Sequence, residues 1–308
     1  MDCSTIIVSY DTFDLTAAAI RSALAGAPGL DHEVIVVDNA SPDESERRLR
    51  EAFAGDARVH VLGAGGNVGF AAANNAGARR ATGRVLFFLN PDTLVLGDAV
   101  ATLVAFVDAH PEAGAVGPRV LNEDRSVQPS AMRFPSPRAL LDHRFPFLAT
   151  RETTRATAVT PTDAVSGCAL AVARAHFDAV GGWDERYFMY SEEIELCLAL
   201  SKRGLQSYLL PSAQIVHYGG RSSLDRYAEQ QVMLAESEMV YLRRHAGAGL
   251  LLLARLSGIV GFGGRAAIFG ALSALRPHLR ERYRHRGEAA AQLLRYYLRP
   301  ARPLGDDR

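Results

Sequence analysis

Short apolar runs alternate with amphipathic segments over the first 120 residues. Four apolar runs each predict a strand, at 5–10, 33–38, 59–62 and 85–89. Three segments with apolar positions at helical spacing lie between them, at 14–24, 42–53 and 70–81. Runs that are apolar at nearly every position indicate strands buried on both faces, as in a parallel sheet covered by helices. We therefore expect an α/β fold with a right-handed, mostly parallel, Rossmann-like central sheet.

The second of these helices has a start signal in the sequence. Ser41 suits an N-cap, Pro42 suits the first helical position, and Glu44 can return the second bond of a capping box. We expect the helix to begin at this point.

The strand at 85–89 is followed at once by Asn90, Pro91 and Asp92. Ligands of open α/β sheets bind at the carboxyl ends of the strands. A carboxylate held there by a proline and a rigid strand suits a divalent cation that is bound against a phosphate. The alternative is that Asp92 caps the next turn, because Asx-Pro turns are common.

Beyond Val95 the pattern predicts a helix at 98–109 and a strand at 115–120, and then becomes irregular. The stretch 122–163 contains five prolines and predicts a long loop, of the kind that is usually functional or mobile. The later elements expected are an ordered apolar segment from Ala164, a helix at 192–202, strands at 207–210 and 213–218, and an amphipathic helix at 225–244.

The stretch 249–275 is strongly apolar but is interrupted by Arg255 and Arg265. Its charge-free runs do not exceed about ten residues, half of what a membrane span requires, so we do not expect it to cross a bilayer. An apolar helix pair followed by the arginine-rich segment 276–286 favours a peripheral contact of 249–286 with anionic lipid. A dimer contact, and so a homo-oligomer, is the alternative.

Composition narrows the function further. The chain has 34 basic and 34 acidic residues, so no overall positive field favours nucleic acid as a partner. Its three cysteines, Cys3, Cys168 and Cys197, have no metal-ligand spacing and are an odd number, which favours a reducing compartment. The amino terminus lacks the basic and apolar regions of a signal peptide, and we expect a cytoplasmic catalytic part.

Four polar residues separated in sequence fall at predicted strand ends or at a helix start: Asp38, Asp92, Glu193 and His217. Their chemistry converges if the substrate is a sugar attached to a nucleoside diphosphate. Asp38 can then accept a hydrogen bond from the imide of uracil or thymine. Asp92 and His217 can share Mn²⁺ or, less well, Mg²⁺ with phosphate oxygens, and the cation would neutralise a departing diphosphate. Each residue also has an ordinary interpretation: Asp38 as a turn residue, His217 as a core histidine, and the glutamates as an acidic first turn.

Glu192 and Glu193 are adjacent carboxyls beside an apolar helix. Close like charges raise proton affinity, so one of the two could act as general base toward an acceptor hydroxyl. In-line displacement of a sugar, with inversion at its anomeric carbon, would follow.

Six motifs in order resemble those of the inverting family-2 glycosyltransferases of the GT-A fold, in particular the bacterial rhamnosyltransferase-like branch. The motifs cover roughly residues 5–223 and are VSYD at 8–11, VVDNASPD at 36–43, GNVGFAAANNAG at 66–77, FLNPDT at 88–93, GGWDERYFMYSEEIELC at 181–197 and PSAQIVHYGGRSS at 211–223. The resemblance implies a glycosyltransferase domain at 1–223, with a nucleotide-binding half at 1–120 and an acceptor and catalytic half at 121–223. Residues 224–308 would form a helical extension.

The resemblance also implies a role for individual residues. Glu193 would be the base, Asp92 and His217 the metal ligands, and Trp183 and Glu192 the acceptor border. The residues implied for the nucleotide sugar are Val8, Tyr10, Asp11, Asp38, Asn39, Gly69, Asn74, Asn90 and Asp92. The donor would be linked to dTDP or UDP, with dTDP-rhamnose as one candidate, and the acceptor would be a cell-surface glycan or its lipid-linked precursor.

Some positions depart from the family's pattern. Asp11 replaces a usual Asn, Glu193 and Glu195 replace usual Asp residues, and Ala199 replaces a frequent Arg. A base longer by one methylene could misplace the proton acceptor by about 1 Å, to which catalysis is sensitive. A degenerate homologue that binds nucleotide or a partner without transferring sugar is therefore the alternative function.

A glycine-rich segment at 63–69 invites a third hypothesis, an NAD-dependent oxidoreductase. The third glycine of a dinucleotide fingerprint would fall on Val68, and the segment follows the third strand rather than the first. The sequence therefore disfavours this function.

Overall fold

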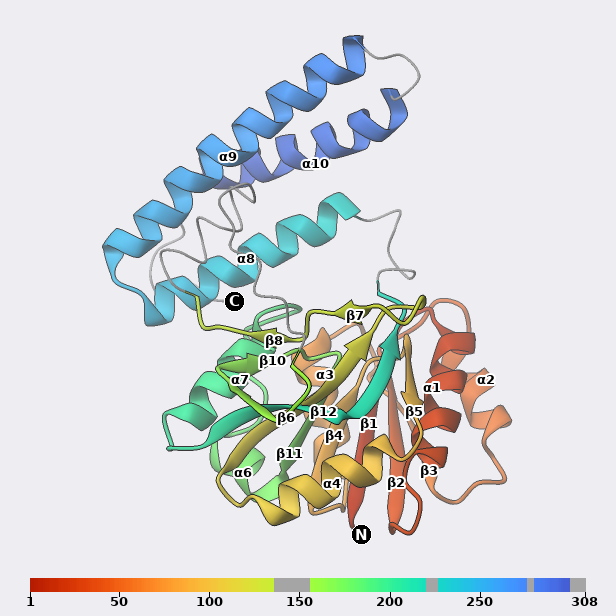
Figure 1. The fold of residues 1–308 in the computed structure, drawn as a ribbon. Coiled ribbons are helices and arrows are strands. Elements are labelled where there is room, and N and C mark those ends of the chain that lie inside the picture. Colours follow the sequence, from red (N-terminus) through yellow and green to blue (C-terminus); the bar gives the residue numbers. More distant parts are fainter. Residues whose placement is uncertain (136–155, 220–226, 276–279, 300–308) are drawn as a thin grey trace. The chain divides into compact units, whose positions relative to one another are not determined.

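A ten-stranded mixed sheet organises the first part of the chain (Figure 1). The structure is a computed structural model that describes residues 1–135, 156–219, 227–275 and 280–299. The central path of the sheet runs β3-β2-β1-β4-β11-β6-β12-β5. Its strands are β1 (Cys3–Ser9), β2 (His32–Asp38), β3 (Val59–Gly63), β4 (Val85–Leu89), β5 (Thr93–Leu96), β6 (Ala113–Leu121), β11 (Ala169–Ala173) and β12 (Gln206–His217).

Short strands complete the sheet at its margins. β7 (Val127–Gln128) pairs with β6, and β9 (Thr160–Thr162) pairs with β12. A separate ribbon joins β8 (Ala131–Met132) to β10 (Ala164–Val165). The long irregular loop expected at 122–163 therefore contains short strands, and its part at 136–155 lies outside the described residues.

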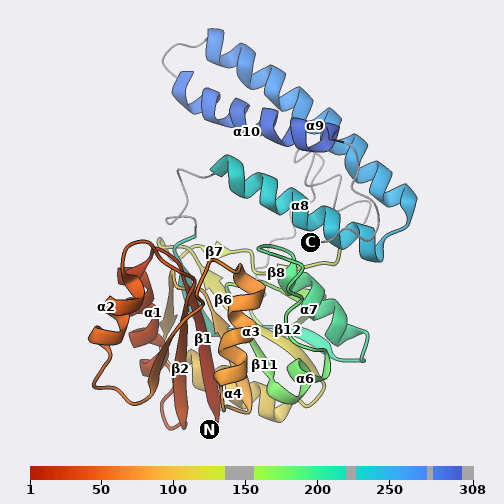
Figure 2. The same cartoon turned by 180° about the vertical axis from the view of Figure 1, so that it is seen from behind.

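Alternating side chains of the central strands fill two separate cores. Ile7, Val36 and Phe87 face the core covered by α1 (Phe13–Ala25) and α4 (Ala99–Ala109). Ile6, Val37 and Phe88 face the other core, covered by α3 (Phe70–Arg80), α6 (Arg174–Ala179) and α7 (Glu192–Ser201) (Figure 2). Both faces are buried, which is why these strands lack the apolar–polar alternation of a half-exposed strand.

The sheet is mostly parallel, as expected. β3, β2, β1 and β4 are parallel neighbours, and β6 is parallel to β12. β11 lies antiparallel between β4 and β6, and β5 lies antiparallel to β12. The strand order reverses direction between β1 and β4, so the carboxyl ends of these two strands flank the position where ligands of such sheets bind.

Two local predictions were wrong. The helix α2 (Ser45–Ala52) starts four residues after Ser41, because Ser41 is used elsewhere: its hydroxyl donates to Asp38 at 2.6 Å and accepts the Asp11 N–H at 2.9 Å. The strands expected at 207–210 and 213–218 form one strand, β12. An irregularity between Leu210 and Gln214 accommodates Pro211, which has no N–H to donate.

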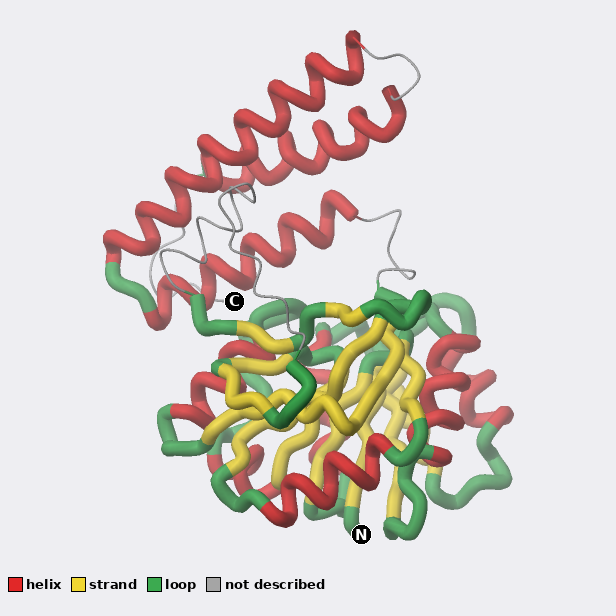
Figure 3. Tube along the Cα trace, in the orientation of Figure 1, coloured by secondary structure: helices red, strands yellow, loops and turns green. Residues whose placement is uncertain are grey.

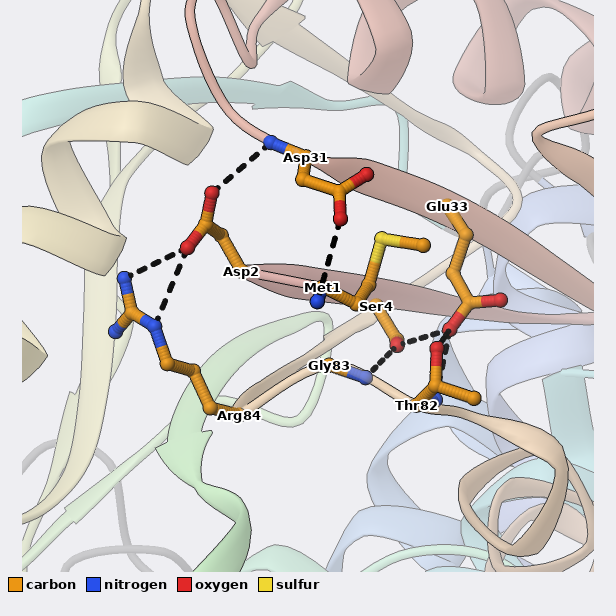
Figure 4. Close-up of polar contacts among 8 residues, drawn as sticks. All are labelled: Met1, Asp2, Ser4, Asp31, Glu33, Thr82, Gly83 and Arg84. Carbon is orange, nitrogen blue, oxygen red and sulfur yellow. Dashed lines mark hydrogen bonds and ion pairs between the residues drawn. The ribbon is translucent and has the colours of Figure 1, made fainter.

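A polar cluster ties the sheet together at the end opposite to the candidate site (Figure 4). The carboxylate of Glu33, 2% exposed, accepts hydrogen bonds from the Ser4 hydroxyl and from the backbone N–H and hydroxyl of Thr82, each at 2.7 Å. The Ser4 hydroxyl also accepts the Gly83 N–H at 2.8 Å. The cluster therefore connects β1, β2 and the turn before β4.

Residues 189–191, 227–275 and 280–299 belong to a second compact unit, which is helical where it forms regular structure (Figure 3). Its helices are α8 (Tyr227–His245), α9 (Ala248–Leu275) and α10 (Arg280–Leu298). α9 and α10 form a close pair in which Phe262 stacks on Tyr297, with ring centroids 5.9 Å apart. A side chain at Gly258 would meet the Tyr297 ring at 2.8 Å, so this glycine permits the close approach.

Among the described residues, α9 is the one helix long and apolar enough to cross a membrane, judged by length and composition. Its exposed positions bear no charge: they include Leu252, Leu256, Val260 and Ile268. The two arginines are otherwise engaged, since Arg255 donates to the Tyr297 carbonyl and Arg265 lies over the Phe262 ring. The expectation that 249–275 does not span a bilayer stays a prediction.

Candidate functional site

The structure brings Asp92 and His217 together at one end of the sheet. β5 follows Asp92 and pairs with the last residues of β12, with Thr93 opposite His217. The Asp92 carbonyl accepts the Tyr218 N–H at 2.9 Å, and its carboxylate oxygen Oδ1 lies 3.3 Å from His217 Nε2. Asp92 is 6% exposed, so this carboxylate is held in a fixed position among few water molecules.

Asp92 and His217 fit a shared divalent cation by their chemistry. A carboxylate oxygen and an imidazole nitrogen are a mixed ligand pair that suits Mn²⁺ better than Mg²⁺. Among the described residues there is no cluster of three or more metal-ligating side chains. Asp92 and His217 are therefore two candidate ligands among the described residues, and a cation bound by them would take further ligands from substrate or water.

A loop between β10 and β11 connects this pair to Glu193. The Asn90 N–H donates to the Cys168 carbonyl at 2.9 Å, directly after β4. A side chain added at Gly167 would lie 3.4 Å from the Glu193 side chain. Burial raises the pKa of the Cys168 thiol to about 12, and the nearby charges of Asp92 and Glu193 act in the same direction. Cys168 thus lies near both Asp92 and Glu193, and Gly167 lies beside Glu193.

The two glutamates at the start of α7 differ in environment. Glu192 is 5% exposed, and its Oε2 atom has no hydrogen-bond partner among the described residues. Burial, and then the neighbouring Glu193 charge, raise the pKa of Glu192 well above its ordinary value. Glu192 therefore keeps its proton far more readily than an exposed glutamate. Glu195 lies on the same helix and accepts a hydrogen bond from the Tyr187 hydroxyl at 3.1 Å.

The ends of β1 and β2 hold the residues expected at the nucleotide base. Val8 packs into the core and Tyr10 is half-exposed. Asp38 is 1% exposed and accepts two hydrogen bonds from Ser41, from the backbone N–H at 2.9 Å and from the hydroxyl. A carboxylate oxygen can accept more than one hydrogen bond, so a base imide would share Asp38 with Ser41.

Backbone strain accompanies these strand ends. Asp11 has φ +57° and Ala40 has φ +63°, both in the left-handed region that favours glycine. Asp11 is held there by its bond to Ser41. Strained backbone of this kind gathers at ligand sites more often than elsewhere.

Asn39 anchors the glycine-rich segment to the end of β2. Its Nδ2 donates to the Asn67 side-chain oxygen, and its Oδ1 accepts the Val68 N–H, each at 2.9 Å. Gly69 follows with φ +86°, and a side chain there would meet the Phe188 carbonyl oxygen at 2.6 Å. Only glycine suits Gly69, and the segment leads directly into α3.

Asn74 and Trp183, expected at the donor and at the acceptor border, are both buried. Asn74 is 1% exposed and donates to the Phe70 carbonyl within its own helix. Trp183 is 2% exposed and contacts the rings of Phe70, Phe88 and Phe177 edge-on. Their roles at the donor and the acceptor stay predictions.

Three residues that shape the site were missed from the sequence. Asn75 bonds both the N–H and the carbonyl of Trp183 and so fixes the segment before α7. Ser41 holds Asp38 and Asp11, and the side-chain oxygen of Gln128 lies 2.8 Å from His217 Nδ1, within hydrogen-bond distance. Asn75 lies within a motif that the sequence made visible, whereas nothing local to Gln128 indicated its partner.

The site is located by these strand ends and not by the size of a cavity. A cavity of about 450 Å³ lies beside β3, and Arg50, His60 and Arg80 are among the residues that line it. None of the candidate site residues lines it.

Comparisons with known proteins give one family. The sequence model described as Glycosyl transferase family 2 matches residues 4–176. N-acetylglucosaminyl-diphospho-decaprenol L-rhamnosyltransferase of Mycobacterium tuberculosis is 30% identical over 236 residues, which cover 70% of this chain and 76% of that protein. Rhamnosyltransferase WbbL of Escherichia coli K12 is 28% identical over 193 residues, 58% of this chain and 72% of that protein.

Solved structures give the same fold. A mannosyltransferase from Pyrobaculum calidifontis, in complex with GDP-Man and Mn²⁺, has a TM-score of 0.60 at 19% identity, covering 96% of this chain and 85% of that one. TarS of S. aureus in complex with UDP has a TM-score of 0.52 at 15% identity, covering 96% and 89%. The expected GT-A fold with a C-terminal helical region is therefore confirmed.

Proposed function

The chain belongs to glycosyl transferase family 2, and from this premise we propose that it is a metal-dependent, inverting enzyme. The donor is a nucleoside diphosphate sugar linked to dTDP or UDP, with dTDP-rhamnose as the leading candidate. The acceptor is a hydroxyl of a cell-surface glycan or of its lipid-linked precursor. The rhamnosyltransferases among its relatives support the choice of sugar, and the decaprenol diphosphate in one of their names supports a lipid-linked acceptor.

The contact between Asp92 and His217 is the observation on which this proposal depends. Two far-apart segments meet at the carboxyl end of β4 and place a carboxylate beside an imidazole. Mn²⁺ or Mg²⁺ bound by these two residues would supply neutralisation of the charge that develops on the departing diphosphate. The role of Asp92 and His217 would be to bind the cation and to orient it toward the diphosphate. Asp92 is held in place for this role by burial and by the hydrogen bond between its carbonyl and the Tyr218 N–H.

Glu193 is the proposed general base. Its side chain lies beside Gly167. Cys168, the residue after Gly167, accepts a hydrogen bond from the Asn90 N–H at the end of β4. Its carboxylate would accept the proton of the acceptor hydroxyl while that oxygen attacks the anomeric carbon, and the bond to the diphosphate breaks on the opposite side. Inversion of the anomeric centre follows from a single in-line displacement.

Glu192 supports this assignment. Its raised pKa favours its neutral form, in which it adds little negative charge beside Glu193. The neutral carboxyl of Glu192 suits a place at the acceptor border, where it can donate a hydrogen bond to a sugar hydroxyl.

The test is release of nucleoside diphosphate from dTDP-rhamnose and UDP-sugars, with a panel of glycan and lipid-linked acceptors, with and without Mn²⁺. We expect Glu193→Gln to reduce turnover by about 10²- to 10⁴-fold, the range for loss of a general base. Nucleotide binding, followed by thermal shift, should stay within about twofold, because the base does not contact the nucleotide. Glu195→Gln makes the same change two residues along α7 and should retain turnover.

Undiminished turnover of Glu193→Gln would remove the proposed base. Tight nucleotide binding by the unaltered chain, with no transfer to any acceptor, would instead favour a homologue that binds nucleotide without catalysis. Absence of a metal effect on both binding and turnover would count against the cation at Asp92 and His217.

The second unit suits a peripheral place on the cytoplasmic face of a membrane. The exposed positions of α9 are apolar, and α10 with the residue after it exposes Arg284, Arg286, Arg295 and Arg299. Apolar surface together with arginine is the combination that binds anionic lipid. A lipid-linked acceptor would then be reached without leaving the membrane surface.

A further inference from the structure

A chain of side-chain hydrogen bonds leads from the β6–β7 turn to His217. The Ser126 hydroxyl donates to the Asp124 carboxylate at 2.5 Å, and Asn122 Nδ2 donates to the Ser126 hydroxyl at 2.9 Å. Gln128 Nε2 donates to Asn122 Oδ1 at 3.2 Å, and Gln128 Oε1 lies 2.8 Å from His217 Nδ1. Five side chains are thus linked in sequence.

The direction of every bond in this chain is fixed by its first member. An ionised carboxylate only accepts hydrogen bonds, so Ser126 must donate to Asp124. The Ser126 hydroxyl then accepts from the Asn122 amide nitrogen, which turns the Asn122 oxygen toward Gln128. Gln128 donates to that oxygen with its amide nitrogen, and its own oxygen is left facing His217. The His217 Nδ1 atom must therefore bear a proton and donate it.

A histidine that donates from Nδ1 has a bare lone pair on Nε2 when it is neutral. Here Nε2 lies 3.3 Å from the Asp92 carboxylate, which is also an acceptor. The Nε2 lone pair and the Asp92 carboxylate are both acceptors, and neither has a hydrogen to donate to the other. Such a pair attracts a cation. Ligating histidines usually donate their second ring nitrogen to an oxygen acceptor in this way.

The strand pairing brings Gln128 to this position. Val120 on β6 pairs with Gln128 of β7 on one side and with Ile215 of β12 on the other, two residues before His217. A side chain at Gly219 would lie 3.4 Å from Gln128 Nε2 and 3.8 Å from His217 Nδ1, so the backbone at Gly219 packs against both groups. Gln128 and His217 are half-buried, whereas the outer members Asp124 and Ser126 are exposed.

We propose that Gln128 is a positioning residue that sets the tautomer of His217, so that the Nε2 lone pair faces Asp92 and is available to a divalent cation. The cation is part of the proposed function and the inference rests on it to that extent. The hydrogen-bond chain itself involves only residues of this protein. Without the Gln128 oxygen, His217 would place its proton on Nε2 and donate it to Asp92, which blocks the nitrogen that a cation needs.

The test combines two measurements on the full chain. Long-range ¹H–¹⁵N spectra of histidine-labelled, metal-free protein at about pH 8.5 report the tautomer of His217, whose signal is identified by its loss in His217→Asn. Electron paramagnetic resonance of free Mn²⁺, in the presence of saturating UDP, gives the Mn²⁺ affinity. In the unaltered chain we expect the Nδ1–H tautomer.

Gln128→Met keeps the length of the side chain and removes the acceptor. We expect this variant to move His217 to the Nε2–H tautomer and to weaken Mn²⁺ binding by about 10- to 100-fold, the range for loss of such a supporting bond. Gln128→Glu restores an acceptor and should retain the Nδ1–H tautomer. Gln214→Met makes the same change on β12 outside the hydrogen-bond chain and should alter neither measurement.

Retention of the Nδ1–H tautomer and of Mn²⁺ affinity in Gln128→Met would overturn the inference. A changed tautomer in Gln128→Met, in a protein that does not bind Mn²⁺ in its unaltered form, would support the role of Gln128 and overturn the proposed cation. The two measurements thus separate failure of this inference from failure of the proposed function.

Discussion

Two identical side chains adjacent in sequence acquire different chemistry at the start of α7. Glu192 is buried, whereas Glu193 is half-buried and lies beside the loop that approaches β4. Desolvation of a carboxyl favours its neutral form, and a neighbouring negative charge adds to this preference. The sequence identified the pair and its mutual effect on proton affinity, but not which member is the more buried.

The burial of Glu192 gives a testable pH dependence. Since its pKa in the folded protein is raised above its ordinary value of 4.5, the folded state holds a proton that the unfolded chain releases. Its favourable contribution is complete below about pH 4.5 and is lost as pH rises toward the folded pKa. We expect Glu192→Gln, which cannot ionise, to be more stable than the unaltered chain at pH 8 and to lose this advantage toward pH 5.

The measurement is urea unfolding of both proteins at several pH values between 5 and 8. A stability difference that is independent of pH would contradict the assignment of a protonated Glu192.

At the residue scale, the sequence located groups at strand ends and missed their partners. Asp92 and His217 could be predicted to meet, because each ends a strand of one sheet and such ends share an edge. Gln128 could not be linked to His217, because it lies in a short strand within an irregular stretch and its partner is 89 residues away. Side-chain hydrogen bonds across such distances have no periodic signal in the sequence.

At the scale of elements, the predicted and observed bounds agree best for the elements that are most deeply buried. β4 has the predicted bounds and β1, β2 and β3 differ by at most two residues, because strands buried on both faces are visible as apolar runs. The start of α2 was mispredicted because the buried carboxylate of Asp38 competes for the Ser41 hydroxyl that a capping box needs. Local signals fail where a tertiary contact uses the same atom.

The hydrogen bonds around Glu33 lead to a prediction about the stability of the sheet. Burial by itself would raise the pKa of Glu33, but hydrogen bonds from Ser4 and Thr82 outweigh it and hold the pKa below its ordinary value of 4.5. We expect Glu33→Gln to lower the free energy of unfolding at pH 7 by about 1–3 kcal/mol, since buried donors lose a charged acceptor. Glu46→Gln, at an exposed pair with Arg50, should cost at most about 0.5 kcal/mol.

The sign of the pH effect is opposite to that of Glu192. A carboxyl whose folded pKa is depressed stabilises the fold above its ordinary pKa, and this contribution is lost as pH falls through the folded value. The difference between the unaltered chain and Glu33→Gln should therefore shrink on acidification below about pH 4.5, measured by chemical denaturation. Nucleotide binding should be unchanged, because the cluster lies at the other end of the sheet.

At the scale of the whole molecule, the exposed apolar face of α9 leads to a prediction of membrane binding. We expect the chain to sediment with vesicles that contain phosphatidylglycerol and to be released by salt, because arginine attraction to anionic lipid is screened. The double variant Leu256→Asp with Val260→Asp should reduce sedimentation several-fold. Val159→Asp changes an exposed apolar residue of the first unit and should not reduce sedimentation.

The alternative, a dimer contact through α9, predicts a different result in the same sedimentation experiments. If the unaltered chain ignores vesicles, sediments as a dimer in solution, and becomes monomeric in the double variant, the face of α9 is a contact between two copies of this chain.

The antiparallel pairing of β5 with β12 has a consequence for synthesis on the ribosome. Asp92 leaves the exit tunnel about 125 residues before His217, an interval of roughly 6–25 s at ordinary elongation rates. During that interval β5 has no strand partner, and an apolar edge is open to other nascent chains. A fragment that stops short of β12 would contain Asp92 without His217, so the proposed cation site would be complete only in the last moments of translating the first unit.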